Sequence, residues 1–260
     1  MSKRIDRIGE KGINNFGSEM VIVEYRKAID IDIYFPQYDW TAKNRVYDSF
    51  KKGTISCPYE KRVYGEGYIG EGDYTVWKNG KHTKVYKTWC HMLERCYSKK
   101  YHEKEPTYKD CEVVKDLLNF QNFGEWYENN YYKIEGETMH LDKDILYKGN
   151  KIYSPETCIF VPHSINKLFI KNDKCRGNLP IGVTYYKQTG KFVAQCSVYD
   201  NEKKIKRTKR LGYYNTPEEA FEVYKQFKEQ YIKEVADYYK EQIPTKLYDA
   251  LYNYQVEITD

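Results

Sequence analysis

The feature that most constrains this fold is a pattern of three strands followed by one long amphipathic helix. Alternating and β-branched residues predict strands at 181–186, 191–197 and 206–214. Thr216-Pro217-Glu218-Glu219 then predicts a helix start, with a capping side chain, a proline at the first helical position and a glutamate three residues after the cap. Apolar residues follow at steps of three and four and predict one buried stripe: Ala220, Tyr224, Phe227, Tyr231, Val235 and Tyr238. Such a helix can cover one face of the sheet and leave the other face open.

The third predicted strand carries a dense basic run. Positive residues greatly outnumber acidic ones between Arg176 and Arg210, and the candidate phosphate contacts are Lys206, Arg207, Lys209 and Arg210. A charge run is often just a solvated surface, but beside an open sheet face it indicates contact with nucleic acid. Because side chains alternate along a strand, Lys206 and Arg210 share one face, and we expect Arg207 and Lys209 at the rim.

The same segment resembles a known family of DNA-binding domains. Its motifs are Gly182-Val183, then GKFVA at 190–194, then LGYYNTPEEAF at 211–221. Together they are similar to the APETALA-two (ethylene-response-factor) domain, whose members read double-stranded DNA through the sheet. The resemblance implies DNA contact at the outward positions Ile181, Thr184, Tyr186, Gln195, Ser197, Thr208 and Arg210, and we add Lys191 to these candidates. Most of the family's arginines and tryptophans are replaced here, so the resemblance implies the fold and not the plant-type base specificity.

Length and composition bound the class of protein. A chain of 260 residues has room for two or three small domains, and its net charge of +5 is mildly basic. The N-terminus has no apolar core segment, and no stretch is long enough to span a bilayer. Seven cysteines without a signal peptide indicate reduced thiols. We therefore expect a cytoplasmic protein with no membrane partner.

Residues 1–80 are predicted to form a small antiparallel β-barrel domain, SH3-like in size. Strand-like segments at 20–25 and 29–35 flank a turn, and the second alternates strictly, as a half-buried strand should. Shorter strand-like pieces follow at 46–50, 53–55 and 67–72. Such barrels bind nucleic acid or protein about equally often, so this domain indicates no function by itself.

Residues 81–175 change from helical spacing to a hairpin that is followed by a short helix. Two helix faces are predicted, one of Trp89, Met92, Leu93 and Cys96 and one of Leu117, Phe120, Phe123 and Tyr127. Strand-like pieces at 139–145 and 158–162 flank a turn-rich segment, and a short helix follows near 164–169. A hairpin and then a helix is the skeleton of a ββα-metal nuclease site.

This middle segment resembles the HNH-endonuclease-like proteins of bacteriophages. The motifs are Trp89…Met92…Arg95-Cys96-Tyr97, Phe120…Phe123…Trp126, Leu141-Asp142-Lys143-Asp144-Ile145 and Tyr153-Ser154-Pro155-Glu156-Thr157-Cys158…Asn166. Many of those phage proteins also join the nuclease-like segment to an APETALA-two-type domain, which in this chain is predicted at 176–260. The resemblance implies a metal-dependent DNA endonuclease in the cytoplasm of an infected or lysogenic bacterial host.

An HNH site needs a histidine general base on its first strand and a metal that stabilises the leaving phosphate oxygens. In the typical motif the base follows an aspartate directly, whereas here Lys143 follows Asp142 and Thr157 occupies the place of the asparagine that orients the base. His140 is the alternative base, and the last partner is matched by His163 or Asn166.

His140, Asp142 and Asp144 would share one face of a strand, because side chains repeat with period two. Two carboxylates and one imidazole suit Mg²⁺ or Mn²⁺, so Asp142 and Asp144 are the candidate ligands. In the alternative interpretation both acids are solvated residues beside a turn, and His140 is an ordinary strand residue.

Cysteines offer a different metal site. The phage resemblance also has cysteine at the places of Cys96, Cys111 and Cys158, and His91, Cys90 or His140 could supply a fourth ligand to zinc. No Cys-x-x-Cys pair is present. The alternative is that these thiols are buried and act as small apolar side chains.

The sequence therefore predicts an α+β protein that binds double-stranded DNA, with two hypotheses for its function. The first is a homing-type endonuclease of a phage or mobile element, in which the C-terminal sheet holds the target and the middle segment cuts. The second is a non-catalytic phage protein that regulates DNA, or that binds and inhibits a host defence protein.

Overall fold

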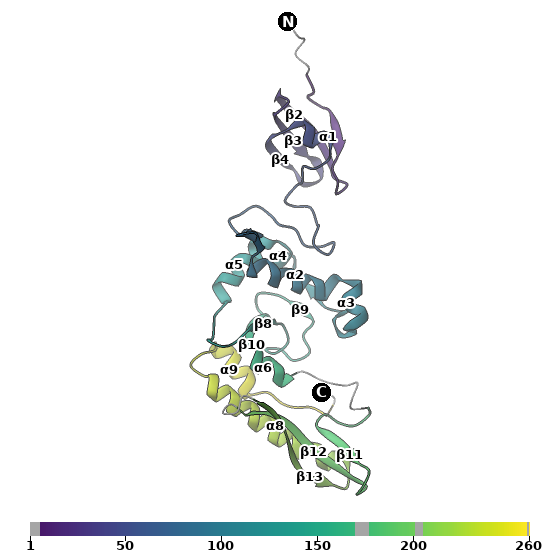
Figure 1. Ribbon diagram of the computed structural model, residues 1–260, viewed down its shortest axis with the longest axis vertical. Helices are drawn as coiled ribbons and strands as arrows, with labels where there is room; N and C mark the ends of the chain where they lie inside the picture. Colours follow the sequence, from purple (N-terminus) through teal and green to yellow (C-terminus); the bar gives the residue numbers. More distant parts are fainter. Residues whose placement is uncertain (1–5, 170–176, 201–204, 259) are drawn as a thin grey trace. The chain divides into compact units, whose positions relative to one another are not determined.

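The computed structural model describes residues 6–169, 177–200, 205–258 and 260 (Figure 1). Its contacts divide the chain into one unit of Met1–Tyr131 with Lys151–Glu156 and a second of Tyr132–Asn150 with Thr157–Asp260. Both units combine helices with small, mostly antiparallel sheets, which confirms the α+β class. The three-domain division stays a prediction. Within the described residues, no helix combines the length and the apolar character that crossing a bilayer requires.

The first unit begins with an open antiparallel sheet. Its four strands lie in chain order: β1 (Lys11–Ile13), β2 (Glu19–Lys27), β3 (Asp30–Phe35) and β4 (Trp40–Arg45). Alternating residues of β2 and β3 point inward, and Phe50 of α1 (Tyr47–Lys51) packs in the same core. The predicted closed barrel is not confirmed, because in the described residues β1 pairs only with β2 and no ladder joins β1 to β4.

Helices make up most of the rest of the first unit. The helical elements are η1 (Pro36–Tyr38), α2 (Lys84–Tyr97), α3 (Lys99–Lys104), η2 (Pro106–Tyr108), α4 (Lys115–Leu118) and α5 (Phe120–Asn130). A hairpin of β5 (Trp77–Lys78) and β6 (Lys81–His82) precedes α2, and β7 (Glu112–Val113) pairs in parallel with β9 (Ile152–Tyr153). Both predicted helix faces are buried, and the Trp89 indole donates to the Leu117 carbonyl at 2.8 Å.

The second unit contains the predicted hairpin-and-helix segment. β8 (Met139–Asp142) pairs antiparallel with β10 (Ile159–Pro162), and α6 (His163–Asn166) and η3 (Lys167–Phe169) follow directly. Val161 and Ile165 of this segment share a hydrophobic core with Ile232 of α8 (Pro217–Tyr239) and Leu247 of α9 (Thr245–Tyr252). The hairpin-and-helix segment is therefore packed on the end of the long C-terminal helix.

The C-terminal sheet has the predicted three strands. β11 (Val183–Tyr186), β12 (Lys191–Asp200) and β13 (Ile205–Tyr214) pair antiparallel in that order, and α8 covers one face (Figure 1). Thr216 and Glu219 form the predicted capping box at the start of α8. Helix start and sheet are thus both as the sequence predicts.

The predicted stripe on α8 is confirmed at Ala220 and Tyr224 and is out of phase from Phe227 onward. The buried residues are Ala220, Phe221, Tyr224, Lys228, Ile232, Ala236 and Tyr239, whereas Phe227, Tyr231 and Val235 are half-buried and Tyr238 is 62% exposed. The buried line passes through position 228, which is a lysine. A prediction from apolar residues alone therefore passes over Lys228 and continues along the adjacent, half-buried face of the helix through Phe227, Tyr231 and Val235.

A substitution at Gly182 tests the packing between the sheet and α8. Its φ is +76°, and a Cβ added there would lie 2.1 Å from the Tyr224 ring, whereas Gly190, with φ +68°, has only the Tyr185 hydroxyl at 3.8 Å. Left-handed backbone costs a non-glycine residue about 1–3 kcal/mol, and overpacking adds about 1–3 kcal/mol. We expect Gly182→Ala to lower the free energy of unfolding in urea by clearly more than the control Gly190→Ala. Equal losses would contradict this packing.

Candidate nucleic-acid interface

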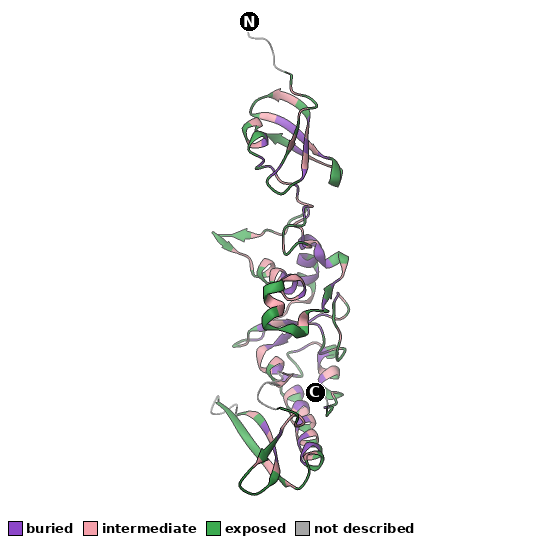
Figure 2. Cartoon of the chain, turned by 90° about the vertical axis from the view of Figure 1, so that its right-hand side faces the viewer, coloured by how far each residue is buried: buried purple, intermediate pink, exposed green. Residues whose placement is uncertain are grey.

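The register of the C-terminal sheet decides which predicted DNA-binding residues share a face. Directly opposed residues of an antiparallel pair point to the same side of a sheet. Five opposed pairs lie on the side away from α8: Tyr186–Lys191, Thr184–Val193, Gln195–Arg210, Ser197–Thr208 and Tyr199–Lys206. The other side carries Val183, Ala194 and Cys196, which pack on α8. We call the first side the open face; Figure 2 shows exposed residues along this sheet and buried residues on the helix beside it.

Three predicted contacts lie elsewhere. Arg207 opposes Val198 and Lys209 opposes Cys196, so both cations point to the helix side of the sheet. The Lys209 amine lies 4.7 Å from the centre of the Phe227 ring, although both basic side chains are exposed. Ile181 packs on the core between the sheet and α8, so its outward placement is wrong.

The open face has an excess of positive charge. Lys191, Lys206 and Arg210 are exposed, and no carboxylate lies within ion-pair distance of these three side chains in the part of the chain that the structure describes. Arg210 Nη1 instead donates to the Tyr213 hydroxyl at 2.7 Å. Cations without acidic neighbours attract an anionic ligand.

Sequence reasoning missed two aromatic residues of this face. Tyr199 is 47% exposed and Tyr213 is 43% exposed, and the rings of Tyr213 and Tyr186 meet edge to face at 5.9 Å. Tyr199 has the same parity along β12 as Gln195 and Ser197, so alternation could have identified it. Tyr213 lies beyond a register shift at Ala194/Gln195, which alternation along β13 does not reveal.

The hairpin-and-helix segment brings two of its candidate residues together. The rings of His140 on β8 and His163 at the start of α6 stack with centres 4.8 Å apart. Nδ1 of His163 is buried, and it has no hydrogen-bond partner within the described ranges. Because β8 ends at Asp142, Asp144 is outside the strand, and the predicted shared face of His140, Asp142 and Asp144 is wrong.

Asp142 and Lys143 hold the turn that follows β8. Asp142 Oδ1 accepts the backbone N–H groups of Asp144 and Ile145 at 2.9 and 2.8 Å, which ends the strand. Lys143 is buried, and its amine donates to the Asp144 carboxylate at 3.1 Å and to the Asn150 carbonyl at 3.0 Å. Lys143, at the position expected for the general base, therefore stabilises this turn.

The candidate metal ligands do not form a cluster in the described residues. Over the ranges that the structure describes, no group of three or more His, Cys, Asp or Glu side chains is arranged to hold a metal ion. Cys96, Cys111 and Cys158 are each buried, which suits small apolar side chains, and His91 is exposed. Zinc, Mg²⁺ and Mn²⁺ stay predictions, and Cys175 lies outside the described residues.

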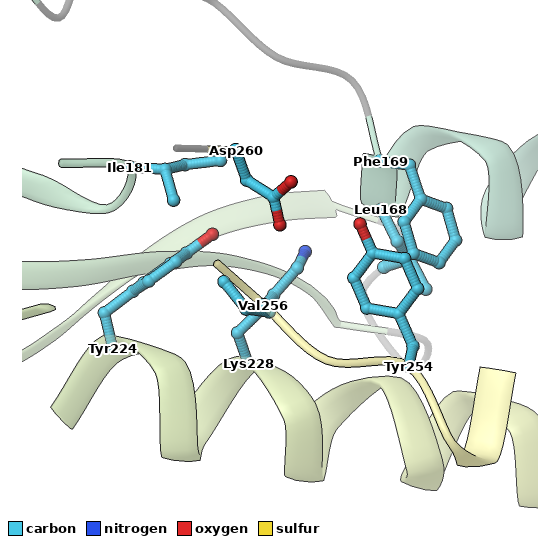
Figure 3. Close-up of a pocket in the computed structure, with 8 residues that line it drawn as sticks. All are labelled: Leu168, Phe169, Ile181, Tyr224, Lys228, Tyr254, Val256 and Asp260. Atoms are coloured by element: carbon cyan, nitrogen blue, oxygen red, sulfur yellow. The ribbon is translucent and has the colours of Figure 1, made fainter. Parts of the chain in front are cut away.

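A small recess lies beside α8 in the second unit. Figure 3 shows Lys228 between Tyr224 and Tyr254, with its amine directed toward the side chain of Asp260. Burial lowers the pKa of the Lys228 amine. Asp260 accepts from the Lys148 amine at 2.8 Å, which fastens the end of the chain above the recess.

Asp142 gives the unit a testable dependence on pH. Burial, reinforced by the neighbouring Asp144 charge, raises the pKa of Asp142 to about 6. The folded protein therefore binds this proton more tightly than the unfolded chain, so the contribution of Asp142 to stability falls as pH rises from about 4 to about 6. Asp142→Asn keeps the Oδ1 acceptor and removes the charge. We expect it to flatten this fall and to stabilise the protein by roughly 1–2 kcal/mol at pH 7.

Thermal melts between pH 4 and 7 measure this effect. The exposed Asp249 supplies the control, because Asp249→Asn also removes one negative charge. An unchanged pH profile in Asp142→Asn would contradict the burial of this carboxylate.

Comparison with known proteins finds a family likeness for the segment that contains the C-terminal sheet. Residues 178–234 match the family model of the AP2 domain, from just before β11 to within α8. Searches of curated proteins and of solved structures each found no match. The HNH likeness of the middle segment and a phage origin gain no support from these comparisons and stay hypotheses. Residues 178–234 are thus similar to the AP2 domain, and this likeness supports a role in binding DNA.

Proposed function

We propose that this protein binds double-stranded DNA with the open face of its AP2-like segment. The observation that carries the proposal is the shared placement of Lys191, Lys206 and Arg210 on the side away from α8, without carboxylates beside them. Phosphate contacts of this kind supply most of the affinity of a DNA-binding protein and position it on the double helix.

The shape of the open face suits the major groove. Between its long cations stand the shorter side chains of Thr184, Gln195, Ser197 and Thr208. Short polar residues let a sheet approach the base edges, and a major groove about 12 Å wide admits β-strands. Gln195 can pair with adenine, and Arg210, whose guanidinium is fixed by Tyr213, can pair with guanine.

Two double variants with equal charge change test this orientation. Lys206→Gln/Arg210→Gln removes cations from the open face, and Arg207→Gln/Lys209→Gln removes two from the helix side of the same strand. If about four phosphates are neutralised, log affinity falls against log salt with a slope of roughly −3.6. We expect the open-face pair to weaken binding at least about tenfold and to reduce the slope by about 1.8.

Fluorescence anisotropy of labelled duplex DNA over a salt series gives both quantities. The helix-side pair serves as the control and should lose much less affinity. Equal losses would place the DNA along the edge of β13, and a salt-independent affinity would remove the basis of the proposal.

A second candidate function is metal-dependent DNA cleavage in the cytoplasm of a bacterial host, as in an HNH-like enzyme of a phage or mobile element. The observation that favours it is the stacked pair of His140 and His163 on a strand pair followed by a helix. One imidazole would activate water, and Asp142 with Asp144 would hold Mg²⁺ or Mn²⁺. Lys143 supplies no base, because its amine is bound to Asp144 and Asn150.

Plasmid nicking with Mg²⁺ or Mn²⁺ tests this candidate. We expect weak nicking that His140→Ala and His163→Ala each reduce by about 10²–10⁴-fold, the usual contribution of a positioned base. His91→Ala is the control, since this histidine is exposed and lies on α2. No metal-dependent nicking by the unaltered protein would contradict the candidate. It would favour the alternative, a non-catalytic protein that regulates DNA or inhibits a host defence protein.

A further inference from the structure

The β5–β6 hairpin of the first unit directly precedes α2 and is hydrogen-bonded at its base. Asn79 and Gly80 at its tip have φ of +51° and +71°, the left-handed pair that a tight two-residue hairpin turn requires. At its base, Thr83 donates to the carbonyls of Val76 and Thr75, each at 3.0 Å, and its hydroxyl caps α2. The hairpin is thereby fastened to the start of a long helix.

An exposed tryptophan ends a stack of rings that begins in the core. The buried Phe120 ring meets Tyr86 at 5.4 Å, Tyr86 meets His82 at 4.9 Å, and His82 lies 3.7 Å from Trp77, measured between ring centres. Trp77 is 59% exposed. One side of its indole is supported by His82, so it offers solvent a large aromatic surface that is held in place.

Two lysines lie at the tip of the hairpin, where Lys78 follows Trp77 and Lys81 precedes His82. Lys78 and Lys81 oppose each other across the hairpin, both are exposed, and neither makes an ion pair or a hydrogen bond within the described ranges. Like charges that face each other across a strand pair destabilise it. Because side chains alternate along a strand, the two lysines leave the hairpin on the face opposite Trp77 and His82. Their long side chains can reach around this narrow hairpin, so the indole and both amines can act on one nucleic acid.

We propose that the hairpin is a second nucleic-acid contact, in which Trp77 stacks on an unpaired base and Lys78 and Lys81 bind the neighbouring phosphates. A nucleic acid supplies both a flat ring and adjacent negative charges, and stacking on aromatic residues combined with basic groups is how single strands are bound. The inference deepens the proposed DNA binding and rests on it: the preferred substrate is double-stranded DNA that carries a single-stranded segment.

The test compares three labelled probes with the full chain: a blunt duplex, the same duplex with a single-stranded overhang, and the single strand. Trp77→Ala should weaken binding to the overhang and the single strand by about 5- to 150-fold, the usual effect of losing one stacked base, and to the blunt duplex by less than about twofold. Trp77→Phe should retain part of the affinity. Lys78→Gln/Lys81→Gln should reduce the salt slope on the single strand by about 1.4.

Tyr147→Ala is the matched control, because Tyr147 is also 59% exposed. The inference is overturned if Trp77→Ala and Trp77→Phe bind the overhang as the unaltered protein does, or if the blunt duplex is weakened equally. Lys206→Gln/Arg210→Gln separates the two proposals. If this pair leaves blunt-duplex affinity intact while Trp77→Ala still weakens the overhang, the sheet proposal fails and the hairpin contact stands.

Discussion

The buried line along α8 supports everything that the second unit presents to a ligand. In the first turns of the helix, Ala220, Phe221 and Tyr224 pack beneath the sheet and so leave its other side open. In the last turns, Ile232 and Ala236 pack against the segment that carries His140 and His163. Tyr239 adds a polar link, because its hydroxyl donates at 2.7 Å to Glu137, which also accepts from Ser164 of α6. Both candidate sites of this unit therefore depend on one helix.

Lys228 stands on that line, between the residues that pack on the sheet and those that pack on α6. Its burial is unfavourable for the charged amine, which explains the lowered pKa. The long aliphatic part can cover apolar surface while the amine reaches the recess beside Tyr224 and Tyr254 (Figure 3). A lysine thus fills a buried position that a search for apolar residues passes over, and this is why the predicted stripe on α8 leaves the buried line after Tyr224.

Alternation predicts the sheet better than it predicts what surrounds the sheet. Gln195, Ser197, Thr208 and Arg210 share one face as the sequence predicts, because period two follows from strand geometry itself. The strand through His140 ends early, because the Asp142 carboxylate accepts two backbone N–H groups that would otherwise continue it. The stacking of His140 on His163 depends on the register between two strands and on the start of α6. The spacing of residues in the sequence does not predict this register or the place where α6 begins.

Basic residues with a structural role differ from those available for binding in the partners that their charged groups contact. Lys143 is buried and bound to Asp144 and a carbonyl, so its charge is neutralised inside the turn and stabilises it. Lys206 and Arg210 are exposed on the sheet without carboxylate partners in the described part of the chain, so their charge acts on a ligand that approaches the open face. A bound phosphate would therefore displace no carboxylate from these two side chains. The fold therefore presents Lys206 and Arg210 on the side of the sheet that α8 does not cover, where the AP2-like segment is proposed to meet DNA.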